Sequence, residues 1–176
     1  MVAGYSHPPQ VGLRPPCHRV DPRARRWWAA QAWLTVSGPL LLTAVALLVL
    51  SALFFPGALP WLGPLTALVL VLPALVYALA MPRVRYRVHA WEVGWSAVYA
   101  ASGWFWQKRR IAPLSRVQTV DTRRGPLQRR YGLATVTVTT ASTAGDVTIA
   151  GVSDEVARQL AEHIGTAART LAGDAA

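Results

Sequence analysis

The most conspicuous absence in this sequence is charge: residues 27–82 contain no Asp, Glu, Lys or Arg. A gap of this length is enough for two bilayer crossings, since each needs about 20 consecutive apolar residues. Two apolar runs, 27–55 and 61–81, fill the gap, and the uncharged PGALP segment between them predicts a tight turn. A buried helical hairpin of a soluble protein is the alternative, but a chain of 176 residues has too small a core to enclose such a segment. We therefore predict two transmembrane helices.

Cysteine and the common catalytic motifs are also scarce or missing. Cys17 is the single cysteine, so no intrachain disulfide can form, which agrees with a reducing compartment. With its neighbour His18 it offers one thiolate and one imidazole, too few ligands for a tetrahedral metal site. There is no glycine-rich phosphate loop, nucleophile elbow or H-E-x-x-H motif, and the four histidines are scattered. We expect no enzyme, no cofactor and no metal site.

The arginines that flank the apolar runs predict the orientation in the membrane. They precede the first run and follow the second, whereas the connecting turn has none: Arg14, Arg19, Arg23, Arg25 and Arg26, then Arg83, Arg85 and Arg87. Because basic flanks stay on the cytoplasmic side, we predict a multi-pass protein of the cell (inner) membrane with both termini in the cytoplasm. The first apolar run begins too late and is too long for a cleavable signal peptide, so the anchor is expected to remain.

The chain divides by composition into four parts. Residues 1–26 are proline-rich and basic without apolar periodicity, which predicts a flexible cytoplasmic arm. Residues 27–82 hold the two transmembrane helices, in which Pro39 and Pro73 predict kinks. Residues 83–171 are expected to form a small folded domain, and residues 172–176 a short tail.

Beyond Pro82 the pattern changes to short runs of period two, typical of antiparallel strands. RVRYRVHA, WEVGWSAVYA, GWFWQKRRIA, RVQTVDTRR, LATVTVTT and DVTIAG together predict about six strands. In LATVTVTT the core face should carry Ala134, Val136 and Val138. From Ser153, a predicted N-cap, the period becomes helical, with an apolar stripe at Val156, Leu160, Ile164, Ala167 and Leu171. The sequence therefore predicts a curled antiparallel sheet or barrel capped by a C-terminal helix.

Positive charge is concentrated in the first half of this domain. The chain has a net charge of +10, and from Arg83 to Arg130 eleven basic residues stand against two acidic ones. Around a predicted turn at Gly125 and Pro126, one hypothesis is a site for anionic lipid headgroups, each basic residue contributing about 1 kcal/mol of attraction; its residues are Arg123, Arg124, Arg129 and Arg130. The other interpretation is that these arginines determine topology and line a solvated rim.

Aromatic residues beside basic ones also raise the possibility of nucleic-acid binding. Trp104, Phe105 and Trp106 precede a lysine and two arginines, a combination seen on surfaces that stack bases and bind phosphates. We expect the three aromatic residues to alternate along a strand and to serve in packing, and a membrane tether argues against this partner. No nucleic acid is therefore expected.

The stretch from Gly103 to Ser142, followed by a strand and a Glu/Ala-rich helix, resembles the membrane-anchored bacterial pleckstrin-homology-like (PH-like) proteins of the YdbS type. The segments R-V-Q-T-V-D, G-P-L-Q-R and G-L-A-T-V carry the resemblance. It implies an α+β fold class: a two-helix transmembrane hairpin followed by a small PH-like curled antiparallel sheet or barrel capped by a C-terminal helix. It implies no catalytic residues. The family pattern falls on residues with expected structural roles: Gln118, Asp121, Gly125, Pro126, Leu127 and Gly132.

Within that pattern the resemblance gives three residues particular roles. Gly125 and Pro126 should reverse the chain, and Leu127 should anchor the turn to the core. If the segment is structural, we expect Asp121 to pair with Arg123 or Arg129. His89 and Ala90 depart from the family pattern.

These observations favour a non-catalytic scaffold or interaction module at the cytoplasmic face of the cell membrane. Its expected partners are the lipid bilayer and either a neighbouring membrane protein or a second copy of the chain, joined through a strand edge or groove. The alternative is a direct sensor of anionic lipid headgroups through the basic loop 123–130. A scaffold's association should depend little on salt, whereas binding through exposed charges should fall steeply with ionic strength.

Overall fold

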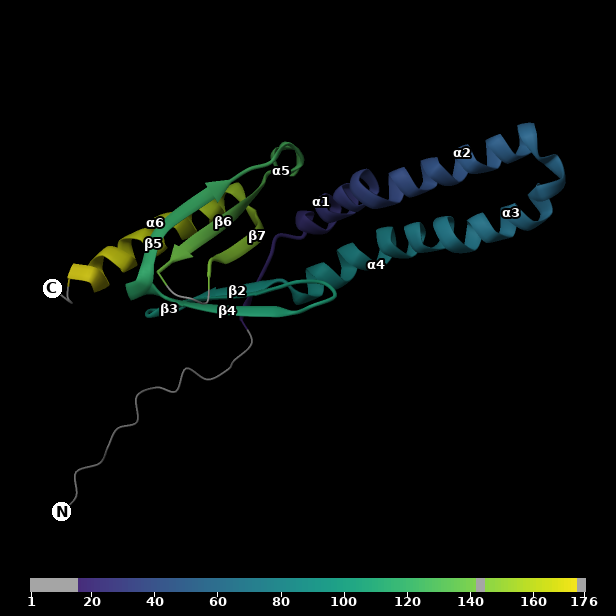
Figure 1. Ribbon diagram of the computed structural model, residues 1–176. Helices are drawn as coiled ribbons and strands as arrows, with labels where there is room; N and C mark the ends of the chain where they lie inside the picture. The colour runs from purple at the N-terminus through teal and green to yellow at the C-terminus, as the bar shows by residue number, and fades with distance from the viewer. Residues whose placement is uncertain (1–15, 142–144, 174–176) are drawn as a thin grey trace, which may run out of the picture.

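The charge-free residues fold into a helical hairpin that extends from one end of a small sheet domain (Figure 1). The computed structural model describes residues 16–141 and 145–173, with side chains through residue 170. Two helices, Arg23–Phe54 and Pro56–Val88, are long and apolar enough to cross a membrane. Their α-helical parts are α1 (Arg23–Ala32) and α2 (Gly38–Phe54), then α3 (Leu59–Thr66) and α4 (Leu72–Val88).

A π-helical segment precedes each of the two prolines at which the sequence predicts kinks. Trp33–Ser37 lies just before Pro39, and Ala67–Val71 just before Pro73. Proline removes one backbone hydrogen bond and its ring crowds the preceding turn, and a wider π turn relieves both effects. The structure therefore places a local change of helix type where the sequence predicts kinks.

Small side chains pack the two long helices against each other. Ala44, Ala74 and Ala78 are buried, and the Ser37 hydroxyl donates a hydrogen bond to the Ala74 carbonyl oxygen at 2.9 Å. Close backbone approach through small residues is the usual way for helices to associate in lipid, where burial of apolar area gives no advantage. Large side chains such as Leu42 and Leu53 point outward and are more than two-thirds exposed.

The second helix continues beyond the predicted boundary at Pro82. The alternation in RVRYRVHA predicts a strand, but α4 runs to Val88 and the next strand, β2, begins only at Ala90. Tyr77, Met81, Arg85 and His89 are spaced by four residues, so they share one helix face, which packs on α1 and the sheet domain. In this segment, burial of the helical face outweighs the local alternation.

The sheet domain contains two antiparallel sheets. One has the order β1-β2-β3-β4 and the other β5-β6-β7. The strands are β1 (His18–Arg19), β2 (Ala90–Val93), β3 (Ala97–Ser102), β4 (Lys108–Pro113), β5 (Val117–Arg123), β6 (Leu133–Thr140) and β7 (Val147–Ser153). A short helix, α5 (Pro126–Tyr131), joins β5 to β6, and α6 (Asp154–Gly173) follows β7. The predicted fold class is confirmed.

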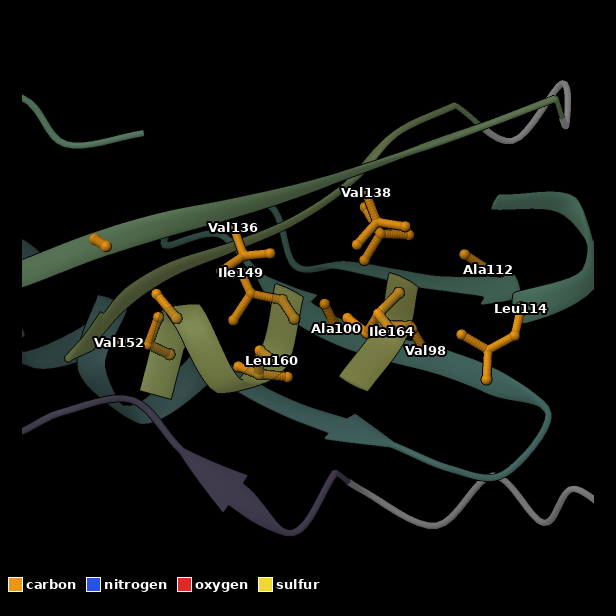
Figure 2. Close-up of a cluster of buried hydrophobic side chains, with 13 residues drawn as sticks. Val98, Ala100, Ala112, Leu114, Val136, Val138, Ile149, Val152, Leu160 and Ile164 are labelled. Carbon is orange, nitrogen blue, oxygen red and sulfur yellow. The ribbon is translucent and has the colours of Figure 1, made fainter. Parts of the chain in front are cut away.

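The core of the domain lies between the sheets and α6, as Figure 2 shows. Ala134, Val136 and Val138 of β6 are fully buried, which confirms the predicted core face, and the alternating Thr135, Thr137 and Thr139 are half-buried. On α6, Leu160 and Ile164 are buried in the same cluster, with Val156 and Ala167 packed against it. The predicted cap is present, since the Ser153 hydroxyl accepts the Val156 N–H at 3.3 Å. The Leu171 side chain lies outside the described residues, and α6 itself extends into the predicted tail as far as Gly173.

The last part of the predicted flexible arm belongs to the folded domain. His18 and Arg19 pair with Trp91 and Ala90 of β2, and the first long helix already begins at Arg23. The prediction of a flexible arm up to residue 26 is therefore wrong for residues 18–26, because backbone pairing to β2 and burial of Val20 hold this segment in place. Residues 1–15 lie outside the described residues.

A second cluster of buried side chains joins the hairpin to the sheet domain. It is centred on Trp28, which has no exposed surface, and includes Leu133 of β6. The other buried members are Val20, Ala24, Ala32 and Met81. We refer to this cluster as the junction. At the junction α1 approaches β7 so closely that a Cβ on Gly151 would lie 2.8 Å from the Cβ of Ala24.

Replacement of Gly151 should loosen the junction. Gly151 has a φ of +83°, which disfavours any side chain, so Gly151→Ala combines backbone strain with a clash against Ala24. We expect a loss of about 1–3 kcal/mol in stability, measured as a lower thermal midpoint of the full chain in detergent micelles. Gly165→Ala is the control: this glycine is helical with open space around it, and the change should stabilise by about 0.5–1 kcal/mol. Equal effects of the two substitutions would contradict the role given to Gly151.

Candidate functional site

The predicted basic turn is a short helix with its arginines on two elements. Gly125 precedes α5, and Pro126 is its first residue, so the chain reverses through a helical turn and not through a simple loop. Arg123 ends β5, whereas Arg129 and Arg130 lie in the last turn of α5, and all three are exposed. In Figure 1, α5 lies at the end of the sheet domain beside α1. The segment therefore faces the end of the domain from which the hairpin extends.

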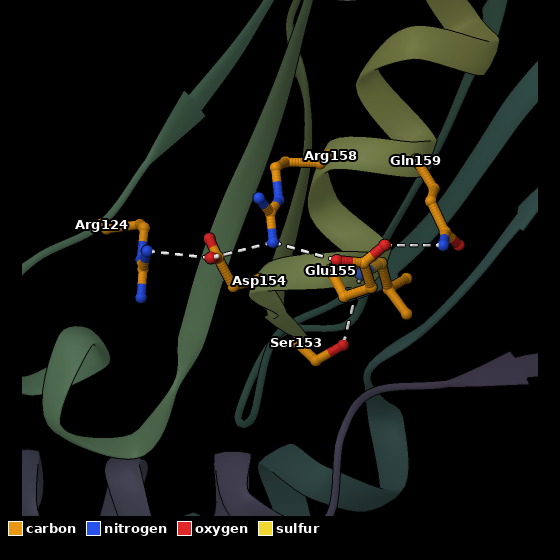
Figure 3. Close-up of polar contacts among 7 residues, drawn as sticks. Arg124, Ser153, Asp154, Glu155, Arg158 and Gln159 are labelled. Atoms are coloured by element: carbon orange, nitrogen blue, oxygen red, sulfur yellow. Dashed lines mark hydrogen bonds and ion pairs between the residues drawn. The ribbon is translucent and has the colours of Figure 1, made fainter.

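Arg124, the fourth arginine of the predicted site, is held by the first turn of α6. Its guanidinium lies 3.0 Å from the Asp154 carboxylate, which also lies 3.6 Å from Arg158, and Arg158 pairs with Glu155 at 2.9 Å (Figure 3). Exposed ion pairs of this kind each contribute less than about 1 kcal/mol to stability, but the carboxylate neutralises the charge of the arginine locally. The positive charge free for an anion is therefore carried by the three arginines other than Arg124.

Gln128, not Leu127, is the buried residue of α5. Leu127, the anchor implied by the resemblance, is half-buried and belongs to neither buried cluster, whereas Gln128 is 7% exposed. The Gln128 Oε1 accepts the Gly125 N–H at 2.8 Å, and its Nε2 donates to the Thr135 hydroxyl at 2.7 Å. A single polar side chain thus holds the start of α5 on β6.

Gly132 and Asp121 are two further residues of the family pattern. Gly132 ends α5 with a φ of +66°, the left-handed conformation that closes a helix. Asp121 is exposed on β5, and neither Arg123 nor Arg129 lies within ion-pair distance of it in the part of the chain that the structure describes. The expected ion pair of Asp121 is therefore wrong: the acid that pairs with this segment is Asp154.

A groove lies between β5 and α6 on the sheet domain. β5 is an edge strand of its sheet, and the ladder with β6 is interrupted between Val117 and Thr119, so that Gln118 bulges. The groove has a volume of about 380 Å³; β5 contributes residues 117–120 and α6 contributes Ala161, Gly165, Ala168 and Arg169. We call it the β5–α6 groove. The sequence did not predict this groove, and Gln118 was expected to have only a structural role; the spacing of three small residues on α6, beside the apolar stripe, was the available signal.

The aromatic residues 104–106 form the turn between β3 and β4. They were expected to alternate along a strand, but β3 ends at Ser102 and β4 begins at Lys108. Trp104 contacts Tyr77 of α4 edge to face at 5.4 Å, while Phe105 and Trp106 are about three-quarters exposed. The turn therefore lies against the hairpin, which agrees with aromatic residues at the boundary of a bilayer.

His89 is a buried histidine where the hairpin meets the sheet domain. Its ring lies 4.7 Å from the Trp28 ring, and its Nδ1–H donates to the Arg85 carbonyl oxygen at 2.8 Å. Burial lowers the pKa of His89 to about 4, and the nearby Arg85 charge acts in the same direction. His89 and Arg85 line a cavity of about 340 Å³ with the aromatic turn and Lys108. Among the described residues no group of three or more His, Cys, Asp or Glu side chains converges.

Comparison with known proteins agrees with this architecture. Residues 34–168 match the model of the bacterial PH domain family. The chain belongs to this family, with a domain of two antiparallel sheets and a C-terminal helix fixed to a transmembrane hairpin. It is 34% identical over 160 residues to the UPF0699 transmembrane protein YdbS of Bacillus subtilis (strain 168), which covers 90% of this chain and 97% of that protein. No solved structure matches the chain.

The buried His89 should make stability sensitive to acid. Because its pKa is lowered from 6.5 to about 4 in the folded state, the unfolded chain binds a proton first. Its contribution to stability is full above pH 6.5 and is lost as the pH falls from 6.5 to about 4. We expect the thermal midpoint of the full chain in detergent to fall over this range, and to fall less in His89→Gln, whose amide keeps a donor but does not titrate. The same pH dependence in both proteins would contradict the assignment.

Proposed function

We propose that this protein is a non-catalytic scaffold at the cytoplasmic face of the cell membrane, and that its PH-like domain binds an extended segment of a partner along β5. The observation that carries the proposal is the β5–α6 groove. One wall is an edge strand, whose outward backbone N–H and C=O groups can pair with another strand. The other wall is a helix face of small residues, which leaves room for the side chains of that segment.

The position of the groove favours a partner in the cytoplasm over the membrane surface. In Figure 1, β5 starts at the end of the domain away from the hairpin and finishes beside α5. The groove uses residues 117–120, the first part of β5, together with the second half of α6. A segment bound there would lie clear of the bilayer.

The alternative function, an anionic-lipid sensor through residues 123–130, is supported by the place of α5 beside α1. Against it stands the pairing of Arg124 with Asp154, which removes one of the four charges on which the hypothesis depends. The two functions differ in salt dependence, because exposed charges are screened within about 10 Å at 0.1 M salt, whereas strand pairing is not. We therefore favour the scaffold.

The β5–α6 groove is tested by photo-crosslinking in cells of the native host. A photoreactive amino acid at Gln118, inside the groove, should give a crosslinked adduct, and the same amino acid at the exposed Glu162 of α6 should not. Gly165→Trp should abolish the Gln118 adduct, because its side chain enters open space in the groove. An adduct of twice the chain mass indicates a second copy as partner, and any other mass indicates a different protein.

The matched control is His163→Trp, which puts the same ring on the exposed face of α6 outside the groove. It should leave the Gln118 adduct unchanged, and so should a rise in salt from about 0.05 to 0.5 M in isolated membranes. An adduct at Gln118 that persists in Gly165→Trp, or no adduct at all, argues against the scaffold.

The proposal also requires both termini to be cytoplasmic. The basic residues lie at the ends of both long helices that adjoin the sheet domain, and the turn at the other end of the hairpin is uncharged. A C-terminal fluorescent protein that matures only in the cytoplasm should be bright, and a periplasm-dependent phosphatase at the same position inactive. A fusion between Gly57 and Ala58, in the turn, should give the reverse pattern. Activity of the phosphatase at the C-terminus would exclude the proposed face.

A further inference from the structure

The surface between α1 and α4 carries a groove with two chemically different halves. It has a volume of about 590 Å³. Its rim carries Arg23, Arg25, Arg26 and Arg83, and its floor includes Ala29, Trp33, Ala78, Leu79 and Pro82. We call it the arginine groove. It shares no residue with the β5–α6 groove or with the basic segment 123–130, so it is an independent site.

The apolar floor of the arginine groove lies at the depth of lipid acyl chains, and its basic rim lies at the depth of lipid headgroups. Trp33 and Leu79 are about 21 and 23 residues from the turn of the hairpin, which at about 1.5 Å per residue is just over the roughly 30 Å thickness of the hydrocarbon layer. Arg26 and Arg83 lie one to two turns further along their helices, at headgroup depth. The floor therefore meets acyl chains and the rim meets phosphates.

The rim has more positive charge than its own acids compensate. Asp21 lies 3.7 Å from the Arg23 side chain, but within the described residues no carboxylate lies within ion-pair distance of Arg25, Arg26 or Arg83. Arg83 is held over the floor by a hydrogen bond from its Nη1 to the Leu79 carbonyl oxygen at 2.6 Å. Guanidinium groups bind phosphate oxygens in a bidentate geometry, and their charge is stronger at the edge of a low-dielectric layer.

We propose that the arginine groove binds one anionic phospholipid, with the phosphate at Arg25, Arg26 and Arg83 and an acyl chain along Trp33 and Leu79. The opposite face of α1 carries Ala24 and Trp28 into the junction. A lipid in the groove therefore contacts the same helix that positions the sheet domain. Basic pockets between transmembrane helices are a known setting for headgroup binding, and here the continuous apolar floor selects a lipid over free phosphate.

Binding is measured on the purified full chain in a mild, uncharged detergent by native mass spectrometry, with dioleoylphosphatidylglycerol or dioleoylphosphatidylcholine added. Wild type should retain one phosphatidylglycerol at least about tenfold more tightly than phosphatidylcholine. Arg25→Gln/Arg26→Gln/Arg83→Gln should lose this preference. The matched control, Arg123→Gln/Arg129→Gln/Arg130→Gln, removes the same charge from exposed positions and should keep it.

The proposal is overturned if wild type retains the two lipids equally, or if the groove variant keeps the preference for phosphatidylglycerol. It is also overturned if the control variant loses that preference to the same extent, which would indicate an effect of net charge alone. Displacement of the lipid by an equal concentration of inorganic phosphate would also overturn it, since a bare anion would then be sufficient. Because the groove variant can be unstable, wild type is also irradiated with phosphatidylglycerol that carries a diazirine in one acyl chain. Adducts should map to α1 or α4 near Trp33 and Leu79, and adducts confined to other segments exclude the site.

Discussion

The contact of α1 with β7, permitted by the absence of a side chain at Gly151, is the constraint on which the arrangement of this protein depends. It lets Ala24 and Trp28 reach the sheet, where Leu133 and Met81 complete the junction. The transmembrane hairpin and the PH-like domain therefore form one packed unit and are not two parts on a flexible linker. Once α1 is fixed in the bilayer, the position of every surface of the domain relative to the membrane follows.

That fixed geometry separates the surfaces of the domain by their distance from the bilayer. The α5 helix and the aromatic turn between β3 and β4 lie next to the hairpin, whereas the β5–α6 groove lies toward the other end (Figure 1). Exposed arginines and aromatic rings thus lie next to the hairpin, and the open strand edge lies toward the far end of the domain. In the proposed function, this separation would keep a partner segment bound in the β5–α6 groove away from the membrane end of the domain.

The periodicity of apolar residues in the sequence predicted the interiors of the helices and strands better than their ends. The alternation of residues 133–140, the cap at Ser153 and the stripe through Leu160 and Ile164 all appear in the structure. The strand predicted for residues 83–90 does not, because α4 continues to Val88, and residues 104–106 of the strand predicted for 103–112 form the turn between β3 and β4. In both places the alternating pattern is present in the sequence, but packing against a long helix decided the structure: Arg85 lies over the Trp28 ring of α1, and Trp104 contacts Tyr77 of α4.

By itself the sequence determined the class of this protein. A long charge-free segment, strands of period two and an amphipathic final helix each follow from which side chains must be buried away from water. The sequence also contained the family motif, but it did not show which residues contact one another. Only the tertiary structure decided that Arg124 pairs with Asp154, that Gln128 and not Leu127 is buried, and where the β5–α6 groove and the arginine groove form. These features join residues distant in the chain, and no local period records which distant surfaces will meet.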